Sequence, residues 1–181
     1  MTIFIEENGK YALDASEAEW ATDCIHEQFQ QAKTNLSDVD FVVETAQKLL
    51  LVEYKNALIE GCEHPEAFKP GEGKKIHSVV KKYYDSLHYL TLMEKDKPKE
   101  YIYILEYPNG DSVSRRLIRN KLKKMLPFGL QAAFANNVRL IDKVEVLSIN
   151  EWNENEEYGL YPIVPVNGGR HRVGEQIGGR D

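Results

Sequence analysis

Cysteine is scarce in this sequence, and long apolar runs are missing. Only two cysteines occur among 181 residues, Cys24 and Cys62, and they do not form a CxxC pair. This pattern argues against a disulfide framework or a zinc ribbon and favours a reducing, cytoplasmic environment. No run approaches the roughly 18 apolar residues of a membrane-spanning helix. The N-terminus has no signal-peptide pattern, so we expect no membrane association.

Sequence motifs for nucleotide binding and for several common catalytic sites are also missing. The chain has no Walker A, GxGxxG, HExxH or GxSxG motif, and its five histidines are too scattered to suggest a nucleophile–base pair. Cys62 and His64 flank a single residue, but no second pair follows to complete a metal site. An active site in this chain therefore has to be built on carboxylates.

The composition is that of a globular protein, with 42% apolar and 29% charged residues. A length of 181 residues suits one domain. We expect that domain over residues 1–166, with its core at about 15–150. Residues 167–181 are rich in glycine and nearly devoid of apolar side chains, which predicts a flexible tail. The basic residues of this tail, which could touch nucleic acid, are Arg170, His171, Arg172 and Arg180.

The spacing of apolar residues predicts strands and helices that alternate along the chain. Turn signals at Asn8–Gly9 place a hairpin over residues 2–14, and Ser16 is the expected N-cap of a first helix. The first expected elements after the hairpin are a helix over 16–34, a hairpin over 39–52, a loop or a broken short helix over 57–73, and a helix over 74–95. They are followed by a strand over 100–107, a helix over 112–126, a strand region over 138–149, a helical turn at 150–152 and an extended segment over 158–166.

The hairpin over 39–52 carries charged residues at one end. Asp40 lies inside its first apolar run, Val39–Val43, while Glu53 and Lys55 directly follow its second, Leu49–Val52. Alternate residues of a strand share a face, so Glu53 and Lys55 point the same way, and strand pairing can bring Asp40 beside them. Two carboxylates and an ammonium at the edge of an apolar sheet are costly unless something binds there. A hard divalent cation with oxygen ligands would fit.

Asp40, followed by Glu53-x-Lys55 at the end of an apolar strand and then by Asn56, resembles the PD-(D/E)XK nuclease superfamily. The order of elements over residues 15–107 is also similar: a helix, two strands with the motif, a long helix and another strand. One departure is Val39, which stands where the family often has proline. The resemblance implies an α/β, restriction-endonuclease-like fold with a mixed central β-sheet and α-helices on both of its faces.

The resemblance also implies a function, namely Mg²⁺-dependent hydrolysis of DNA phosphodiester bonds, with Mn²⁺ as a substitute metal. Asp40, Glu53 and the backbone carbonyl of Tyr54 would hold the cation, and Lys55 would contact or help to activate the attacking water. The first helix of the family often adds a carboxylate, for which Glu17 is the candidate. The alternative for Glu17 is an interaction with the helix dipole alone.

Basic residues on the two long helices are candidates for contacts with the DNA backbone. Lys82 lies in the middle of the 74–95 helix, where a solvated lysine is the alternative interpretation. The other candidates share one sector of the 112–126 helix, opposite Leu117, Ile118, Leu122 and Met125, and are Arg115, Arg116, Arg119 and Lys123. Residues 69–124 hold 14 Lys or Arg and 7 Asp or Glu, whereas the whole chain has a net charge of −6. Such asymmetry fits a nucleic-acid-binding side or a surface for an acidic protein partner.

Two other functional classes are consistent with the same residues. One is a catalytically inactive member of the fold that acts as a nucleic-acid-binding or protein-binding module. The other is an unrelated α+β interaction protein, for which Asp40 and Glu53 would lie on different faces. The sequence leaves the oligomeric state open, a homodimer included.

Overall fold

The computed structural model describes residues 2–59, 64–134 and 139–166. Cys62 and the predicted tail over 167–181 lie outside the described residues.

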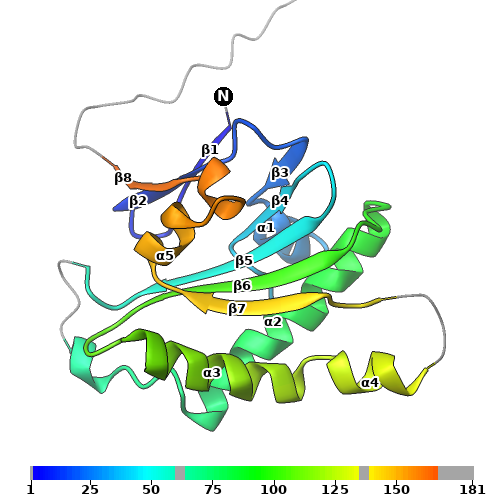
Figure 1. Ribbon diagram of the computed structural model, residues 1–181. Coiled ribbons are helices and arrows are strands. Elements are labelled where there is room, and N and C mark those ends of the chain that lie inside the picture. The colour runs from blue at the N-terminus through cyan, green and yellow to red at the C-terminus, as the bar shows by residue number, and fades with distance from the viewer. Residues whose placement is uncertain (1, 60–63, 135–138, 167–181) are drawn as a thin grey trace, which may run out of the picture.

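A five-stranded mixed sheet forms the centre of the molecule (Figure 1). Its strands, in their order across the sheet, are β3 (Trp20–Thr22), β4 (Phe41–Glu44), β5 (Leu49–Asn56), β6 (Lys99–Glu106) and β7 (Lys143–Leu147). The β3–β4 and β4–β5 pairs are antiparallel, whereas the β5–β6 and β6–β7 pairs are parallel. The predicted α/β class and mixed central sheet are therefore confirmed.

Helices cover one face of this sheet. They are α1 (Ile25–Gln31), α2 (Gly73–Leu92), α3 (Ser112–Met125) and α4 (Phe128–Ala133). Strand β5 alternates its side chains between two faces, and Leu49 and Leu51 point toward these helices. They share a buried cluster with Ile76 and Tyr83 of α2. Helix α2 is thus held against the sheet by an apolar stripe, as its helical spacing predicted.

A second, three-stranded sheet covers the opposite face of the central sheet, together with α5 (Ile149–Glu154) (Figure 1). Its antiparallel strands are β1 (Ile3–Ile5), β2 (Tyr11–Asp14) and β8 (Ile163–Pro165). The β1–β2 hairpin confirms the predicted turn, where Gly9 adopts a positive φ of 68°. Trp152 of α5 stacks on Tyr158 in the short 3₁₀ helix η2 (Tyr158–Leu160), with ring centroids 5.0 Å apart.

The predicted helix over 16–34 is wrong in its first half. Residues Trp20–Thr22 form β3 and pair with β4, and the helix begins only at Ile25. Ser16 is not an N-cap, because its hydroxyl instead accepts a hydrogen bond from the Thr2 N–H. Ile25 and Phe29 do face the core, as the helical spacing predicted. A pairing site on the apolar strand β4 outweighs the local helical pattern, because strand pairing depends on residues distant in the sequence.

Several smaller predictions are also corrected by the structure. The first motif strand begins at Phe41, not Val39, and the strand within 138–149 covers only Lys143–Leu147. Leu92 and Met93, expected on the buried stripe of α2, are exposed at its C-terminal end. The extended segment over 158–166 begins with the helix η2. The 3₁₀ helix η1 (Pro65–Ala67), in contrast, agrees with the short-helix alternative for residues 57–73.

Helix α3 begins with a capping box whose loss should be measurable. The Asp111 carboxylate accepts a hydrogen bond of 2.7 Å from the Ser114 N–H, and the Ser114 hydroxyl accepts one from the Asp111 N–H. Replacing Asp111 with alanine should lower the folding stability measurably, because the Ser114 N–H would lose its cap. Chemical denaturation would measure the loss. The variant Asp111→Asn, which can still cap the helix, should stay near the parent.

Candidate functional site

The β4–β5 hairpin brings the two predicted catalytic carboxylates together. Phe41, the first residue of β4, pairs with Val52. The same register places Asp40, just before the start of β4, beside Glu53. Strand β5 continues there without β4 as a neighbour. The Tyr54 N–H, which has no partner on β4, donates a 2.7 Å hydrogen bond to Oδ2 of Asp40. Asp40 therefore satisfies a backbone donor that strand pairing leaves free, and this bond orients its carboxylate.

A lysine from α2 contacts both carboxylates. Nζ of Lys82 lies 2.8 Å from Oε1 of Glu53 and 3.7 Å from Oδ1 of Asp40, so these two oxygens are at most about 6.5 Å apart. The two acidic side chains thus lie on one side of the sheet. This geometry contradicts the interpretation of an unrelated interaction protein, which required them on different faces.

Glu53 is the more deeply buried of the two acids. Its residue is 6% exposed, and Oε2 has no hydrogen-bond partner among the described residues. Burial, followed by the nearby charge of Asp40, raises the pKa of Glu53 to about 8, although Lys82 acts in the opposite direction. Burial also raises the pKa of Asp40, against the charge of Lys82 and the Tyr54 hydrogen bond. An unpaired buried carboxylate oxygen is costly, so it indicates a position where a further partner could bind.

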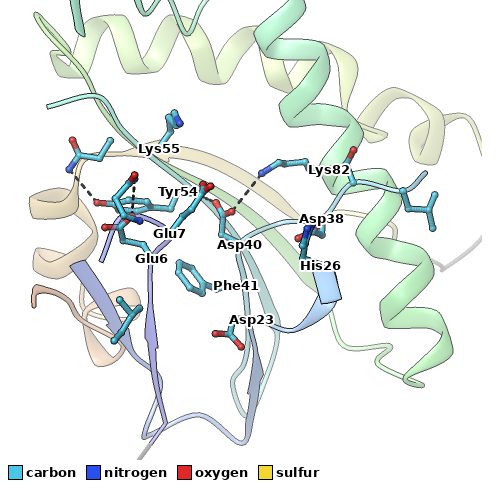
Figure 2. Close-up of a pocket in the computed structure, with 15 residues that line it drawn as sticks. Glu6, Glu7, Asp23, His26, Asp38, Asp40, Phe41, Tyr54, Lys55 and Lys82 are labelled. Atoms are coloured by element: carbon cyan, nitrogen blue, oxygen red, sulfur yellow. Dashed lines mark hydrogen bonds and ion pairs between the residues drawn. The ribbon is translucent and has the colours of Figure 1, made fainter. Parts of the chain in front are cut away.

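The two lysines of the site differ in their environments. Burial disfavours the charged form of Lys82, but the carboxylates of Glu53 and Asp40 outweigh it and raise the pKa of the ammonium. Figure 2 shows Lys82 directed from α2 toward Asp40, whereas Lys55 extends away from Asp40. Lys55 is exposed, and alternation along β5 puts it on the same face as Glu53. Lys82, expected as a phosphate contact, is therefore primarily an ion-pair partner of the two acids here.

Asp40, Lys55 and Lys82 border a pocket of about 550 Å³, whereas the buried Glu53 lies behind Lys82 and is not part of the lining (Figure 2). Its walls come from the β1–β2 turn, the start of α1, the segment before β4, the end of β5 and the middle of α2. The ionisable side chains that line it are mostly acidic, and they are Glu6, Glu7, Asp23, His26, Asp38, Asp40, Lys55 and Lys82. An acidic pocket attracts cations, and it repels phosphate groups unless a cation or basic side chain intervenes.

Glu17 is not brought to this pocket, which corrects its assignment as a further metal ligand from the first helix. It lies in the turn before β3, is exposed, and is absent from the pocket lining. Its charge acts instead on Tyr161, which packs on the opposite face of the central sheet. The predicted helix that would have carried Glu17 toward the site begins eight residues later.

The basic sector predicted on α3 is only partly free for substrate. Arg115 is buried, and its guanidinium donates hydrogen bonds to the Glu151 carboxylate at 2.9 Å and to the Gly110 carbonyl at 2.7 Å. Arg119 donates to Glu145 at 3.0 Å. Leu117, expected on the buried side, is 58% exposed. The phosphate-facing role of Arg115 is therefore replaced by a structural one. Among the predicted basic contacts, Arg116 and Lys123 are exposed, and Lys123 lies over the Phe128 ring.

The donor set at the hairpin end fits a hard divalent cation. Asp40, the unpartnered Oε2 of Glu53 and the Tyr54 carbonyl would supply oxygen ligands, which Mg²⁺ prefers. No group of three or more His, Cys, Asp or Glu side chains suited to a metal ion occurs within residues 2–59, 64–134 and 139–166. Two carboxylates suffice for Mg²⁺, because it usually keeps several waters and completes its shell with substrate phosphate.

The pocket also contains residues that the sequence did not single out, and among them Asp38 and His26 form a pair. The scattered spacing of the five histidines does not point to His26, because its partner is an aspartate twelve residues later, with Nδ1 and Oδ1 3.1 Å apart. The register that pairs position 40 with 53 would also place position 38 near 55, and this signal could have pointed to Asp38.

Comparison with known proteins gave no match: no family model fits the chain, and no curated protein or solved structure is significantly similar to it. In the part of the chain that the structure describes, no helix has both the length and the apolar character to cross a membrane.

Proposed function

We propose that this protein is a Mg²⁺-dependent nuclease of the PD-(D/E)XK type, with a restriction-endonuclease-like fold, that hydrolyses phosphodiester bonds in DNA. The observation that carries this proposal is the convergence of Asp40, at the pocket, and the buried Glu53 on the ammonium of Lys82, with an oxygen of Glu53 left unpartnered. The order of elements supports it. Helix α1, the motif strands β4 and β5, helix α2 and strand β6 follow each other as the family resemblance requires.

Asp40, Glu53 and the Tyr54 carbonyl would hold the cation. When bound, Mg²⁺ lowers the pKa of a coordinated water and offsets negative charge on the phosphate. The Tyr54 N–H fixes the orientation of Asp40, and the wall of the sheet keeps Glu53 away from bulk water. A site with this little freedom loses little entropy when its ligands assemble.

The two lysines have complementary roles in this proposal. Lys55, exposed at the pocket, orients the attacking water or stabilises the negative charge that develops on the phosphate. Lys82 keeps the two acids paired in the metal-free protein, where it competes with a cation for their oxygens. An ammonium displaced from the carboxylates would still line the pocket and could contact a substrate phosphate.

Binding of DNA would use basic side chains outside the acidic pocket. Residues 69–124 hold 14 basic and 7 acidic residues, and within this segment Arg116 and Lys123 are exposed on α3. Such contacts supply affinity for the phosphate backbone without reading its sequence. Weak general affinity is expected, since the chain as a whole has a net charge of −6.

The ion pairs of Lys82 favour one alternative, a catalytically inactive member of the same fold that binds DNA or a protein. In that case Lys82 would be a permanent substitute for a metal ion, because its ammonium contacts both acidic side chains. Titration with Mn²⁺ separates the two functions. The inactive module would not bind the ion, whereas the nuclease would bind it and lose binding in Glu53→Gln.

The direct test is cleavage of linear, supercoiled, branched and single-stranded DNA by the purified protein in Mg²⁺ or Mn²⁺. We expect at least one substrate to be cut, with activity abolished by chelation and strongly reduced in Glu53→Gln. This substitution keeps the size of the side chain and removes the charge that holds a cation. Cleavage no greater than that of the Glu53→Gln control on every substrate would reject the nuclease and leave the binding module.

A further inference from the structure

A histidine–aspartate pair lies on the wall of the same pocket. Nδ1 of His26, in the first turn of α1, is 3.1 Å from Oδ1 of Asp38. Both side chains line the pocket together with Asp40 and Lys82 (Figure 2). The charge of Asp38 is close enough to contribute to the raised pKa values of Asp40 and Glu53. The pair therefore lines the same pocket as Asp40, a proposed metal ligand.

The structure holds Asp38 in place, and the His26 side chain, 65% exposed, lies at the open side of the pair. The segment that carries Asp38 is tied to α2, because the Ser37 N–H donates to the Asp85 carboxylate at 2.7 Å and the Val39 N–H donates to Ser86 Oγ at 3.1 Å. His26 follows Ile25, whose side chain is fully buried in the core under α1. An oriented aspartate fixes the ring of its histidine and selects the tautomer that carries a proton on Nδ1.

Hydrolysis of a phosphodiester needs a group that accepts the proton of the attacking water. Lys82 is a poor acceptor, because the acids beside it raise the pKa of its ammonium. Asp40 and Glu53 would be engaged with the cation in the proposed function. When Nδ1 of His26 donates to Asp38, its other nitrogen, Nε2, has an unshared electron pair. No hydrogen-bond partner of Nε2 occurs in the described part of the chain.

We propose that His26 is the proton acceptor of the reaction and that Asp38 is its positioning residue; this inference rests on the proposed nuclease function. The water oxygen forms a bond to phosphorus while the bond between phosphorus and the leaving oxygen breaks. The proton of the water passes to Nε2 of His26, and the leaving oxygen takes a proton from solvent. The imidazolium, stabilised by the Asp38 carboxylate, then returns its proton to solvent.

The tautomer of His26 can be measured without any substrate. In ¹⁵N NMR spectra of the metal-free protein, at a pH where the ring is neutral, His26 should carry its proton on Nδ1. In Asp38→Asn this preference should weaken, while His88, exposed on α2, should be the same in both proteins. A proton on Nε2 of His26 in the parent would overturn the inference, because no electron pair would then be available.

Kinetics test the same role in the reaction. We expect His26→Ala to lower kcat about 10²-fold or more, within the range of general base catalysis, with little change in KM or in Mn²⁺ affinity. Added imidazole should restore part of the lost rate, and Asp38→Asn should lose less than His26→Ala. The matched control His88→Ala should resemble the parent.

The results of these experiments distinguish a failure of the His26 role from a failure of the proposed nuclease function. If the parent cuts DNA and His26→Ala cuts it equally well, the role of His26 is refuted and the nuclease stands. If His26→Ala is slow but imidazole does not restore any rate, His26 is structural and not a proton acceptor. If the parent cuts no DNA, the proposed function fails and the role of His26 fails with it.

Discussion

Lys55→Ala should lower the rate of DNA cleavage about 10²–10³-fold, the usual effect of losing one electrostatic contact to the transition state. Lys55 lines the pocket and shares the face of Glu53, but it is exposed. Its removal leaves both carboxylates and Lys82 in place. We therefore expect Mn²⁺ to bind with nearly the affinity of the parent, as measured by calorimetry, while single-turnover cleavage collapses.

Glu53→Gln should fail in a different way, with metal affinity and cleavage lost together. Loss of folding would not give this contrast, provided that both variants melt within a few degrees of the parent. Lys33→Gln is a suitable control, since it removes an exposed positive charge at the end of α1 and should keep the activity of the parent. Equal cleavage by Lys55→Ala and the parent would show that Lys55 has no catalytic role.

The motif hairpin could be predicted because its information is local. Two apolar runs with a polar turn between them specify β4 and β5, and alternation along β5 puts Glu53 and Lys55 on one face. The apolar stripe of α2 is likewise local, and its predicted bounds agree closely with Gly73–Leu92. These elements could be assigned from residues near each other in the chain.

The errors arise where distant residues decide the structure. Trp20–Thr22 fit a helical pattern, yet they pair with β4 because that strand offers an open edge. Arg115 fits a basic helix face, yet Glu151 and the Gly110 carbonyl hold it in a buried position. The partner of Glu53 is Lys82, 29 residues away, and no spacing rule in the sequence connects a strand end to the middle of the following helix.

The ion pair of Lys82 and Glu53 should make the stability of the protein depend on pH. The pKa of Glu53 is raised to about 8 in the folded protein from an ordinary value of 4.5. The folded state therefore binds this proton more tightly than the unfolded state. The stabilisation that comes from protonated Glu53 is fully present below the pKa of this residue in the unfolded chain. It is lost as the pH rises through about 8. Lys82 limits this loss, because its ammonium stabilises the ionised carboxylate.

Lys82→Met should therefore be destabilising mainly at high pH. Removing one partner of a fully buried ion pair costs about 3–5 kcal/mol. The Lys82 side chain is 26% exposed, so we expect roughly 2 kcal/mol near pH 9. Near pH 5, where Glu53 is protonated in both proteins, the loss should be small. Urea denaturation of parent and variant at the two pH values measures the difference.

The double variant Glu53→Gln with Lys82→Met shows whether the stability lost in Lys82→Met comes from the interaction of Lys82 with Glu53. Glutamine has the shape of the protonated acid and does not ionise, so the double variant should recover most of the stability that Lys82→Met loses near pH 9. The coupling energy from the four proteins then measures the interaction between the two side chains. If Lys82→Met lost the same stability at both pH values, or if Glu53→Gln restored none of it, the lysine would act through packing of its aliphatic chain and not as the counter-ion of Glu53.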